Sequence, residues 1–374
     1  MANNNNKNKC NVPHLRFPEF SGEWKKYSLG EVADFVKERI STDKLTLTTY
    51  VSTENMRSDF GGINPAISIP NNTNVIHYKK RDVLLSNIRP YLRKVWSANY
   101  DGGCSADVFV FRAKHITPFF LYYIIANDTF INYVMSGAKG VKMPRGDKEQ
   151  MLKYTFSIPT MEEQNKISHI LHLLDDRIST QNKIIEKLET LIKGIYSVVF
   201  QGTFSKECYR LGEISNLYQP STISSANLND DGKYLVYGAN GTIGRYDKYN
   251  HEQPQITITC RGNTCGTVNY TSDFCWITGN SMVVNIEKYI TIVNQRYLFH
   301  YLNNMDFSSI ISGSGQPQIV RTPLEKLKIY LPSFTEQQKI SANIDTIITK
   351  LSLEQSVLGY FQQQKSFLLQ QMFI

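Results

Sequence analysis

The sequence has no long apolar run, and this absence argues against a membrane-spanning helix. Its longest apolar stretch, at residues 119–126, is far shorter than the ~18–20 residues that cross a bilayer. The polar start, MANNNNKNKC, has no apolar core, so we expect no secretory signal. The six cysteines form no CxxC pair, which favours a reduced, cytoplasmic protein over a disulfide-rich secreted one.

Signatures of common enzymes are missing as well. No G-x-x-x-x-G-K-[ST] loop is present, which argues against a P-loop nucleotide hydrolase. The glycines of residues 238–244 do not follow the G-x-G-x-x-G spacing, so we interpret this run as a turn. The chain also has no Asn-Pro-Pro-aromatic or Asp-Pro-Pro-aromatic tetrad, which amino-methyltransferases need.

Two groups of residues remain as candidates for metal chemistry. Cys260, Cys265 and Cys275 have no nearby histidine to complete four zinc ligands, so we interpret them as structural thiols and predict no metal site. Glu19, Glu23 and Lys25 resemble the carboxylate and lysine set of metal-dependent nucleases. They crowd into one entry segment instead of lying on separate strands, so a nuclease is kept only as an alternative.

What the chain does have is size and positive charge. Its 374 residues allow two or three domains, and 41% hydrophobic residues suffice for cores. Lysine and arginine number 41 against 33 acidic residues, for a net charge of +8. This excess suggests a polyanionic partner such as nucleic acid without proving one.

An internal repeat determines the architecture that we predict. The segment at residues 27–34 (YSLGEVAD) recurs at 209–216 (YRLGEISN), and the segment at 158–168 (IPTMEEQNKIS) recurs at 331–341 (LPSFTEQQKIS). Weaker matches between these anchors stay in order, with residues 83–95 opposite 256–268. The chain is therefore two copies of one unit, each a globular part followed by a helix.

The globular parts are predicted to be mixed α/β. Strand composition is found at residues 83–86, 107–111, 255–259 and 281–285, and short helices are expected within 118–136 and 294–312. The predicted organisation is a disordered tail at 1–12, a first domain at 13–157, a helix at 158–201, a second domain at 202–331 and a helix at 332–374.

Both long helices are expected to begin with a capping box and to carry a heptad stripe. Thr160 with Glu163, and Ser333 with Glu336, fit the S/T-x-x-E box. Each stripe has a polar fifth residue, and the two stripes have the same register. Two unrelated amphipathic helices would not be expected to share a register. We therefore expect a coiled coil. The first stripe contains Ile167, Leu171, Leu174, Ile178, Gln181, Ile185 and Leu188, and the second Ile340, Ile344, Ile347, Leu351, Glu354, Leu358 and Phe361.

Basic and amide-rich segments occupy matching places in the two halves. Arginine, lysine, asparagine and glutamine read purine edges, and the two cations also neutralise phosphates. Surface loops are commonly basic for other reasons, so the whole set of loops, at equivalent places in the two halves, indicates DNA binding more strongly than any one residue. The candidate DNA-binding residues are Asn87, Arg89, Arg93, Lys94, Lys142, Arg145, Arg261, Asn263, Asn280, Gln316, Gln318 and Arg321.

Together these motifs resemble the specificity subunits of type I restriction–modification enzymes. The resemblance covers residues 12–374 and depends on residues 12–20 (VPHLRFPEF), 238–244 (GANGTIG), 313–318 (GSGQPQ) and the two proline-led helix starts. The first half departs from the pattern, because its residues 137–142 (GAKGVK) lack the Gln-Pro-Gln of the second.

The resemblance implies two target-recognition domains that each read half of a bipartite, asymmetric DNA site. Antiparallel helices would separate these domains with pseudo-twofold symmetry. It also implies a chain without catalysis or cofactors of its own. S-adenosylmethionine, ATP and Mg²⁺ would belong to two methyltransferase and two restriction subunits. A coiled-coil scaffold that binds only protein is the alternative from another class. The DNA motif and its spacer do not follow from the sequence.

Overall fold

The computed structural model describes residues 11–201, 207–239, 241–313 and 315–374, and divides the chain into two compact units. The first contains the chain up to Gln181 together with Val357–Ile374, and the second is Asn182–Ser356. Each long helix thus contributes one part to each unit. The predicted domain boundaries follow the helix ends instead, and they remain predictions.

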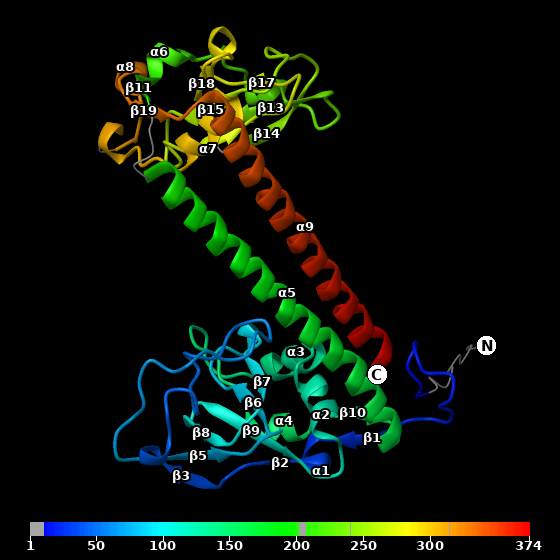
Figure 1. Ribbon diagram of the computed structural model, residues 1–374. Helices are drawn as coiled ribbons and strands as arrows, with labels where there is room; N and C mark the ends of the chain where they lie inside the picture. Colours follow the sequence, from blue (N-terminus) through cyan, green and yellow to red (C-terminus); the bar gives the residue numbers. More distant parts are fainter. Residues whose placement is uncertain (1–10, 202–206, 240, 314) are drawn as a thin grey trace, which may run out of the picture. The chain divides into compact units, whose positions relative to one another are not determined.

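The first unit contains two four-stranded sheets and a short two-stranded one (Figure 1). Helix α2 (Pro118–Ile125) packs on the sheet of order β2-β9-β6-β7, followed by α3 (Asp128–Ser136). The unit also contains the short helices α1 (Leu29–Val32) and α4 (Lys148–Leu152). The strands are β1 (Lys25–Ser28), β2 (Ala33–Phe35), β3 (Arg39–Ser41), β4 (Tyr50–Val51), β5 (Asn74–Tyr78), β6 (Val83–Ser86), β7 (Val95–Ser97), β8 (Gly102–Cys104), β9 (Val108–Ala113) and β10 (Thr155–Ile158).

The second unit repeats this plan, with the three-stranded sheet β14-β13-β17 in place of the four-stranded sheet β3-β5-β8-β4. The sheet of order β12-β18-β15-β16 corresponds to β2-β9-β6-β7, and the pair β11-β19 corresponds to β1-β10. Its helices are α6 (Leu211–Ile214), α7 (Gln295–Asn303) and α8 (Arg321–Glu325). The strands are β11 (Glu207–Arg210), β12 (Asn216–Tyr218), β13 (Tyr234–Gly238), β14 (Gly241–Tyr246), β15 (Ile256–Thr259), β16 (Val268–Tyr270), β17 (Trp276–Ile277), β18 (Ser281–Asn285) and β19 (Lys328–Leu331).

The four strands predicted from composition are confirmed with shifts of one or two residues, whereas Gly102 and Gly103, which are typical of a turn, lie in strand β8. β6 and β18 coincide with the predicted segments, and the first core buries the alternating side chains of β6 and β9 under α2. The glycine run at 238–244 joins β13 to β14, where Gly238 pairs with Gly241, as the turn interpretation requires. Asn240 of that run lies outside the described residues.

The two long helices are α5 (Met161–Gln201) and α9 (Phe334–Met372). None of the fourteen stripe residues is exposed, so the stripe is the covered face of each helix. In the first unit Asp175 pairs with Lys365 at 2.5 Å, and the Arg177 guanidinium lies 5.8 Å from the centre of the Phe361 ring. From the first contact to the second, the residue number rises along α5 and falls along α9. The two helices therefore run antiparallel within this unit. Coiled-coil pairing over their whole length remains a prediction.

In the second unit, a buried histidine connects the end of α5 to the start of α9. The Tyr196 hydroxyl lies 3.0 Å from Nδ1 of His300 on α7, whose Nε2 lies 2.9 Å from Oδ1 of Asp345 on α9. Burial lowers the pKa of His300, so the imidazole is expected to be neutral and to depend on these two partners.

The entry segment at residues 11–24, here called the strap, packs against the start of α5. Arg16 donates to the Glu163 carboxylate from Nε at 2.7 Å and from Nη2 at 2.8 Å, and Lys166 pairs with Glu19. The backbone N–H of Leu15 donates to the carbonyl of Gln371 near the end of α9. The strap therefore ties both helices to the first unit.

The strap also explains why one of the two predicted capping boxes is incomplete. In α9 the box is complete: the Ser333 hydroxyl accepts from the Glu336 N–H, and the Ser333 N–H donates to the Glu336 carboxylate. In α5 the Thr160 hydroxyl accepts from the Glu163 N–H, but the Glu163 carboxylate binds Arg16. The expectation of two reciprocal boxes was therefore wrong for α5.

The predicted disordered tail lies mostly outside the described residues, since these begin at Asn11. The Asn11 amide donates to the Trp24 carbonyl and accepts from the Ser157 hydroxyl, so Asn11 belongs to the folded unit. Within the part of the chain that the structure describes, no helix has the length and apolarity needed to span a membrane.

Candidate nucleic-acid interface

The candidate loops of the first unit meet at one backbone junction, here called the first junction. It joins residues 87–94, which follow β6, to residues 139–146, which precede α4. Ile88 and Lys139 both form antiparallel bridges with Arg145, and the Arg89 N–H donates to the Pro144 carbonyl at 2.9 Å. A third segment joins through the Asn87 N–H, which donates to the Asp107 carbonyl at 2.8 Å.

The second unit builds the same junction 173 residues later, here called the second junction. Arg261 and Ser312 both bridge Gln318, and the Gly262 N–H donates to the Pro317 carbonyl at 3.0 Å. The Cys260 N–H donates to the Asn280 carbonyl at 2.9 Å, in the place of the Asn87–Asp107 bond. Each of these contacts falls at the offset that relates the two helix starts, so the junctions are equivalent position by position.

This equivalence revises how the two halves are matched. The absence of Gln-Pro-Gln from the first half made equivalent contacts there doubtful. The shared bonds place residues 143–145 (Met-Pro-Arg) opposite 316–318 (Gln-Pro-Gln), with the middle proline accepting the same bond in each. The frame is conserved between the halves of the chain, and the side chains that it carries differ.

Left-handed backbone positions also coincide in the two junctions. Gly140 and Gly313 have φ of +96° and +91°. Arg89 and Arg93, at φ +51° and +54°, stand where the second junction has Gly262 and Gly266 at +85° and +91°. A side chain at such a position costs of order 1–3 kcal/mol, because its Cβ crowds the backbone. The first half therefore retains two arginines where glycine would be less strained.

Contacts within the chain account for one of these arginines. Arg93 binds Asp59 from Nε at 3.0 Å and Asp128 from Nη1 at 2.9 Å, and the Asp128 bond raises the pKa of the guanidinium. Arg89 is exposed and has no side-chain hydrogen bond or ion pair among the described residues. An exposed cation retained at a strained position, without a partner in its own chain, is a candidate for contact with another molecule.

The other candidate DNA-binding residues of the first junction also fall into two groups, those with a partner within the unit and those without one among the described residues. Lys94 donates to the Thr53 carbonyl at 2.6 Å and Arg145 pairs with Asp107 at 3.3 Å, so both have partners within the unit. Lys142 is exposed at the tip of the second loop. Asn87 is half-buried, and no described group bonds to its buried amide oxygen.

The candidates of the second junction are all exposed. Arg321, at the start of α8, pairs with Glu325 at 2.7 Å. Ser314, in the same loop, lies outside the described residues. The other exposed side chains are Arg261, Asn263, Asn280, Gln316 and Gln318.

Sequence reasoning missed the acidic side of the first junction. Asp107 occupies the position of Asn280, and its carboxylate orients Arg145. Asp59 and Asp128 similarly hold Arg93. Only the 173-residue offset, applied to Asn280, could have pointed to Asp107; nothing in the sequence joins Arg93 to its partners.

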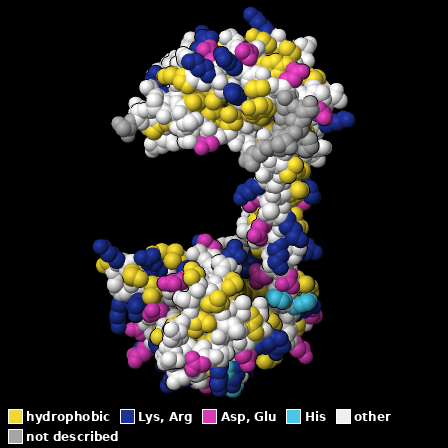
Figure 2. All heavy atoms as spheres, turned by 60° about the vertical axis from the view of Figure 1, so that its left-hand side comes forward, with side chains coloured by type: hydrophobic (Ala, Val, Ile, Leu, Met, Phe, Trp, Pro, Cys, Tyr) yellow, Lys and Arg dark blue, Asp and Glu magenta, His cyan; other side chains and the backbone are white. Residues whose placement is uncertain are grey.

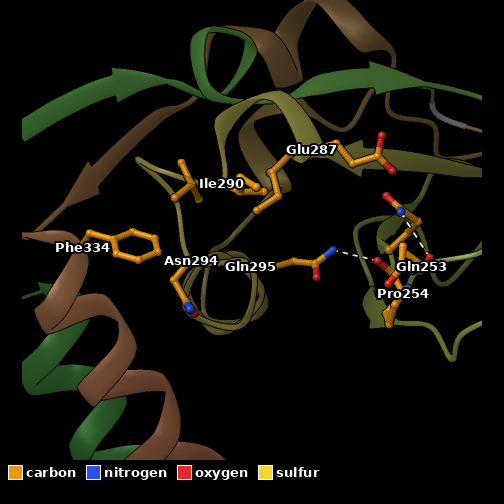
Figure 3. A pocket seen from close by; sticks show the side chains of 10 residues that line it. Gln253, Pro254, Glu287, Ile290, Asn294, Gln295 and Phe334 are labelled. Atoms are coloured by element: carbon orange, nitrogen blue, oxygen red, sulfur yellow. Dashed lines mark hydrogen bonds between the residues drawn. The ribbon is translucent and has the colours of Figure 1, made fainter.

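A cavity of about 300 Å³ opens beside the starts of α7 and α9 in the second unit (Figure 3). Its amides are used internally: Gln295 donates to the Pro254 carbonyl at 2.8 Å and accepts from the Tyr270 hydroxyl at 2.9 Å. Among the described residues that line it, Glu287 is the one ionisable group. A lone carboxylate without a nucleophile, histidine or metal ligand beside it gives no catalytic arrangement.

The cysteines considered as zinc ligands do not gather in the described part of the chain, where no cluster of three or more metal-ligating side chains is found. Cys260 and Cys275 are buried, and burial raises the pKa of the Cys260 thiol to about 11. Protonated, buried thiols pack as small apolar side chains.

The fold and its two junctions define a duplicated recognition protein, in which two α/β lobes present differently equipped loops on one frame. The chain belongs to the family of type I restriction–modification DNA specificity domains, whose model matches residues 21–190 and again 205–358. Its role is therefore DNA sequence recognition as a non-catalytic specificity subunit, with the chemistry in other subunits.

Similar proteins agree with this family. The specificity subunit of the type I restriction enzyme MjaVIII of Methanocaldococcus jannaschii is 23% identical, over 94% of this chain and 91% of that subunit. The specificity subunit of EcoprrI of Escherichia coli is 29% identical, but that match spans only 37% of this chain and 35% of the subunit. The crystal structure of an S subunit from M. genitalium shares the fold, with a TM-score of 0.72, 17% identity and coverage of 97% and 99%.

Proposed function

We propose that this chain reads a bipartite, asymmetric DNA site, one half-site with each junction. The observation that carries the proposal is the matched pair of junctions: the same backbone bonds recur at an offset of 173 residues, with different side chains on them. Because the two junctions share one backbone arrangement, they can approach duplex DNA in the same way, whereas their different side chains read different bases. We therefore expect the two half-sites to differ in sequence.

The two junctions offer different chemistry to DNA. The first presents cations, with Arg89 and Lys142 exposed and without ion pairs among the described residues. The second presents amides at Gln316 and Gln318, beside Arg261. Arginine binds guanine bidentately and glutamine binds adenine, so the two half-sites should differ in base composition.

The proposal includes an assembly. In it two methyltransferase and two restriction subunits join this chain on DNA in the cytoplasm. S-adenosylmethionine, ATP and Mg²⁺ belong to those subunits, and this chain needs no cofactor of its own. Support comes from the relatives, which are named as specificity subunits of restriction enzymes.

Mapping methylated adenines in DNA from cells with and without this chain tests the proposal. We expect a two-part motif with a fixed spacer to lose methylation when the chain is absent. The reconstituted methyltransferase complex should also bind that motif at least 10³-fold more tightly than random duplex, the low end for specific DNA binding. A protein-binding scaffold would show neither the motif nor the preference, and either absence would reject the proposal.

Arg89→Gly should separate DNA binding from stability. Glycine adopts φ +51° without a Cβ clash but makes the unfolded chain more flexible, so the free energy of unfolding should stay within about 1 kcal/mol of wild type. Loss of the cation should weaken DNA binding by the complex about 5- to 150-fold if Arg89 reads a base. A phosphate contact should instead reduce the salt slope by about one. Urea unfolding and duplex titration at several salt concentrations measure the two effects.

Arg81→Gly is the matched control. Arg81 is also an exposed arginine with positive φ, at +76°, but it precedes β6 whereas the junction follows that strand. The control should change stability as Arg89→Gly does and leave DNA binding unaltered. Equal losses of binding in both variants would mean that the effect comes from net charge and not from the junction.

A further inference from the structure

The tip of the first junction carries an apolar side chain among cations. Val141 is 100% exposed, more than any other large hydrophobic residue that the structure describes, and Met143 is 49% exposed. Lys142 lies between them, and Arg145 and Arg89 are exposed at the base of the same loop. Single exposed apolar residues are common on protein surfaces, so exposure alone carries no meaning. The surroundings of Val141 are what require an explanation.

The tip is held in place by its own base. Lys139 and Arg145 exchange two backbone hydrogen bonds of 2.9 Å, and Pro144 is buried beneath them, where its carbonyl accepts from the Arg89 N–H. Gly140, at φ +96°, makes the turn. Because both ends of the tip are paired, Val141 extends from a fixed frame that also positions Arg89.

The second junction has the same turn and a polar tip. Gly313, at φ +91°, corresponds to Gly140, and the exposed Gln316 corresponds to Met143. The counterpart of Val141 in the sequence is Ser314, which lies outside the described residues. At this position of the repeat, the sequence of one half has valine and that of the other has serine.

An apolar group flanked by cations matches one feature of the DNA major groove. Each base edge there presents hydrogen-bond donors and acceptors, and thymine adds the C5-methyl group, the one apolar group among the four bases. Cations beside the tip would neutralise the phosphates along the groove. Figure 2 shows basic and hydrophobic side chains side by side on the surface of the globular parts.

We propose that Val141 contacts the C5-methyl group of a thymine in the half-site read by the first junction, a contact that the second junction does not make at the equivalent position. The proposal deepens the proposed function and rests on it. It explains why this loop differs from its counterpart in polarity while keeping its backbone.

Deoxyuridine is the probe, because it lacks only the methyl group and keeps the pairing of thymidine. Each thymidine of the methylated motif is replaced in turn, and the duplexes are titrated with the reconstituted methyltransferase complex. With the wild-type chain, one replacement in one half-site should weaken binding about 4-fold, the loss expected for one buried methyl group. With Val141→Ser, which introduces the residue of the other half, the same replacement should have no effect.

Ile67→Ser is the control, because Ile67 is 94% exposed in the same unit but lies outside the junction. It should keep the uracil effect at the same position. A half-site without thymine, no uracil effect in either half-site, or an effect that persists in Val141→Ser would overturn the inference. Those outcomes leave the proposed function intact, since that function fails only if no two-part motif is methylated or bound.

Discussion

Inserting one heptad into each long helix should move methylation to sites with a longer spacer. Seven residues add ~10 Å of helix, which corresponds to about three base pairs by length alone. Hydrogen bonds to base edges tolerate far smaller displacements, so methylation at the original spacer should fall to background. Sequencing of methylated adenines in cells that express the variant in place of the wild-type chain measures both changes.

The structure shows where to insert. The boundaries between the two compact units fall after Gln181 in α5 and after Ser356 in α9, so insertions there leave each unit and its core intact. A heptad also preserves the apolar stripe, whose repeat is seven residues. An insertion in α5 alone is the control, since it lengthens one helix without its partner and should abolish methylation at every spacer. If the double insertion kept the original spacer, the two helices would not set the distance between half-sites.

Sequence alone predicted the elements of this fold because they depend on local signals. Strand composition, the heptad stripes and the proline-led helix starts are each contained in short windows, and the structure places β6, β18, α5 and α9 on them. The repeat relates two sets of such windows at an offset of 173 residues. The same offset relates the backbone bonds of the junctions, so the repeat held more information than the sequence comparison extracted. The match between residues 143–145 and 316–318 became visible only through shared hydrogen bonds.

Contacts between distant segments could not be predicted in this way. Arg93 is predicted to bind DNA because it stands in a basic loop, and that stays a prediction; sequence did not show that Asp59 and Asp128 bind it from elsewhere in the fold. Arg89 has the same composition around it and lacks such partners among the described residues. The two arginines share a left-handed backbone, and ion pairing, which depends on tertiary structure, is what distinguishes them. The DNA motif does not follow from the sequence for the same reason.

The strap shows a related limit, and it leads to the prediction with the largest effect on stability. Glu19 and Glu23 of the strap, together with Lys25 of β1, suggested a nuclease; in the structure Glu19 pairs with Lys166 and the strap holds the start of α5. Glu163 is fully buried there, and its ion-pair partner Arg16 has 14% of its side chain exposed. Arg16→Ala should therefore lower the free energy of unfolding by about 3 kcal/mol, because it leaves a buried carboxylate without its cation. Urea unfolding of a variant in which Trp96 and Trp276 are replaced by phenylalanine, with and without Arg16→Ala, measures this loss through the fluorescence of the buried Trp24 in the strap.

Two further variants separate the buried charge from the rest of the strap. Lys166→Ala removes the pair with Glu19, whose side chains are 46% and 47% exposed, and should cost less than about 1 kcal/mol. Arg16→Met combined with Glu163→Leu replaces both charges by apolar groups, and should recover most of the stability that Arg16→Ala loses. If the double variant were as unstable as Arg16→Ala, the four hydrogen bonds of Arg16, two of them to the carbonyls of Ser21 and Gly22, would matter more than the unpaired charge. Arg16 would then act mainly by ordering the strap. In either case the strap has a structural role, because it holds the start of α5 and the end of α9.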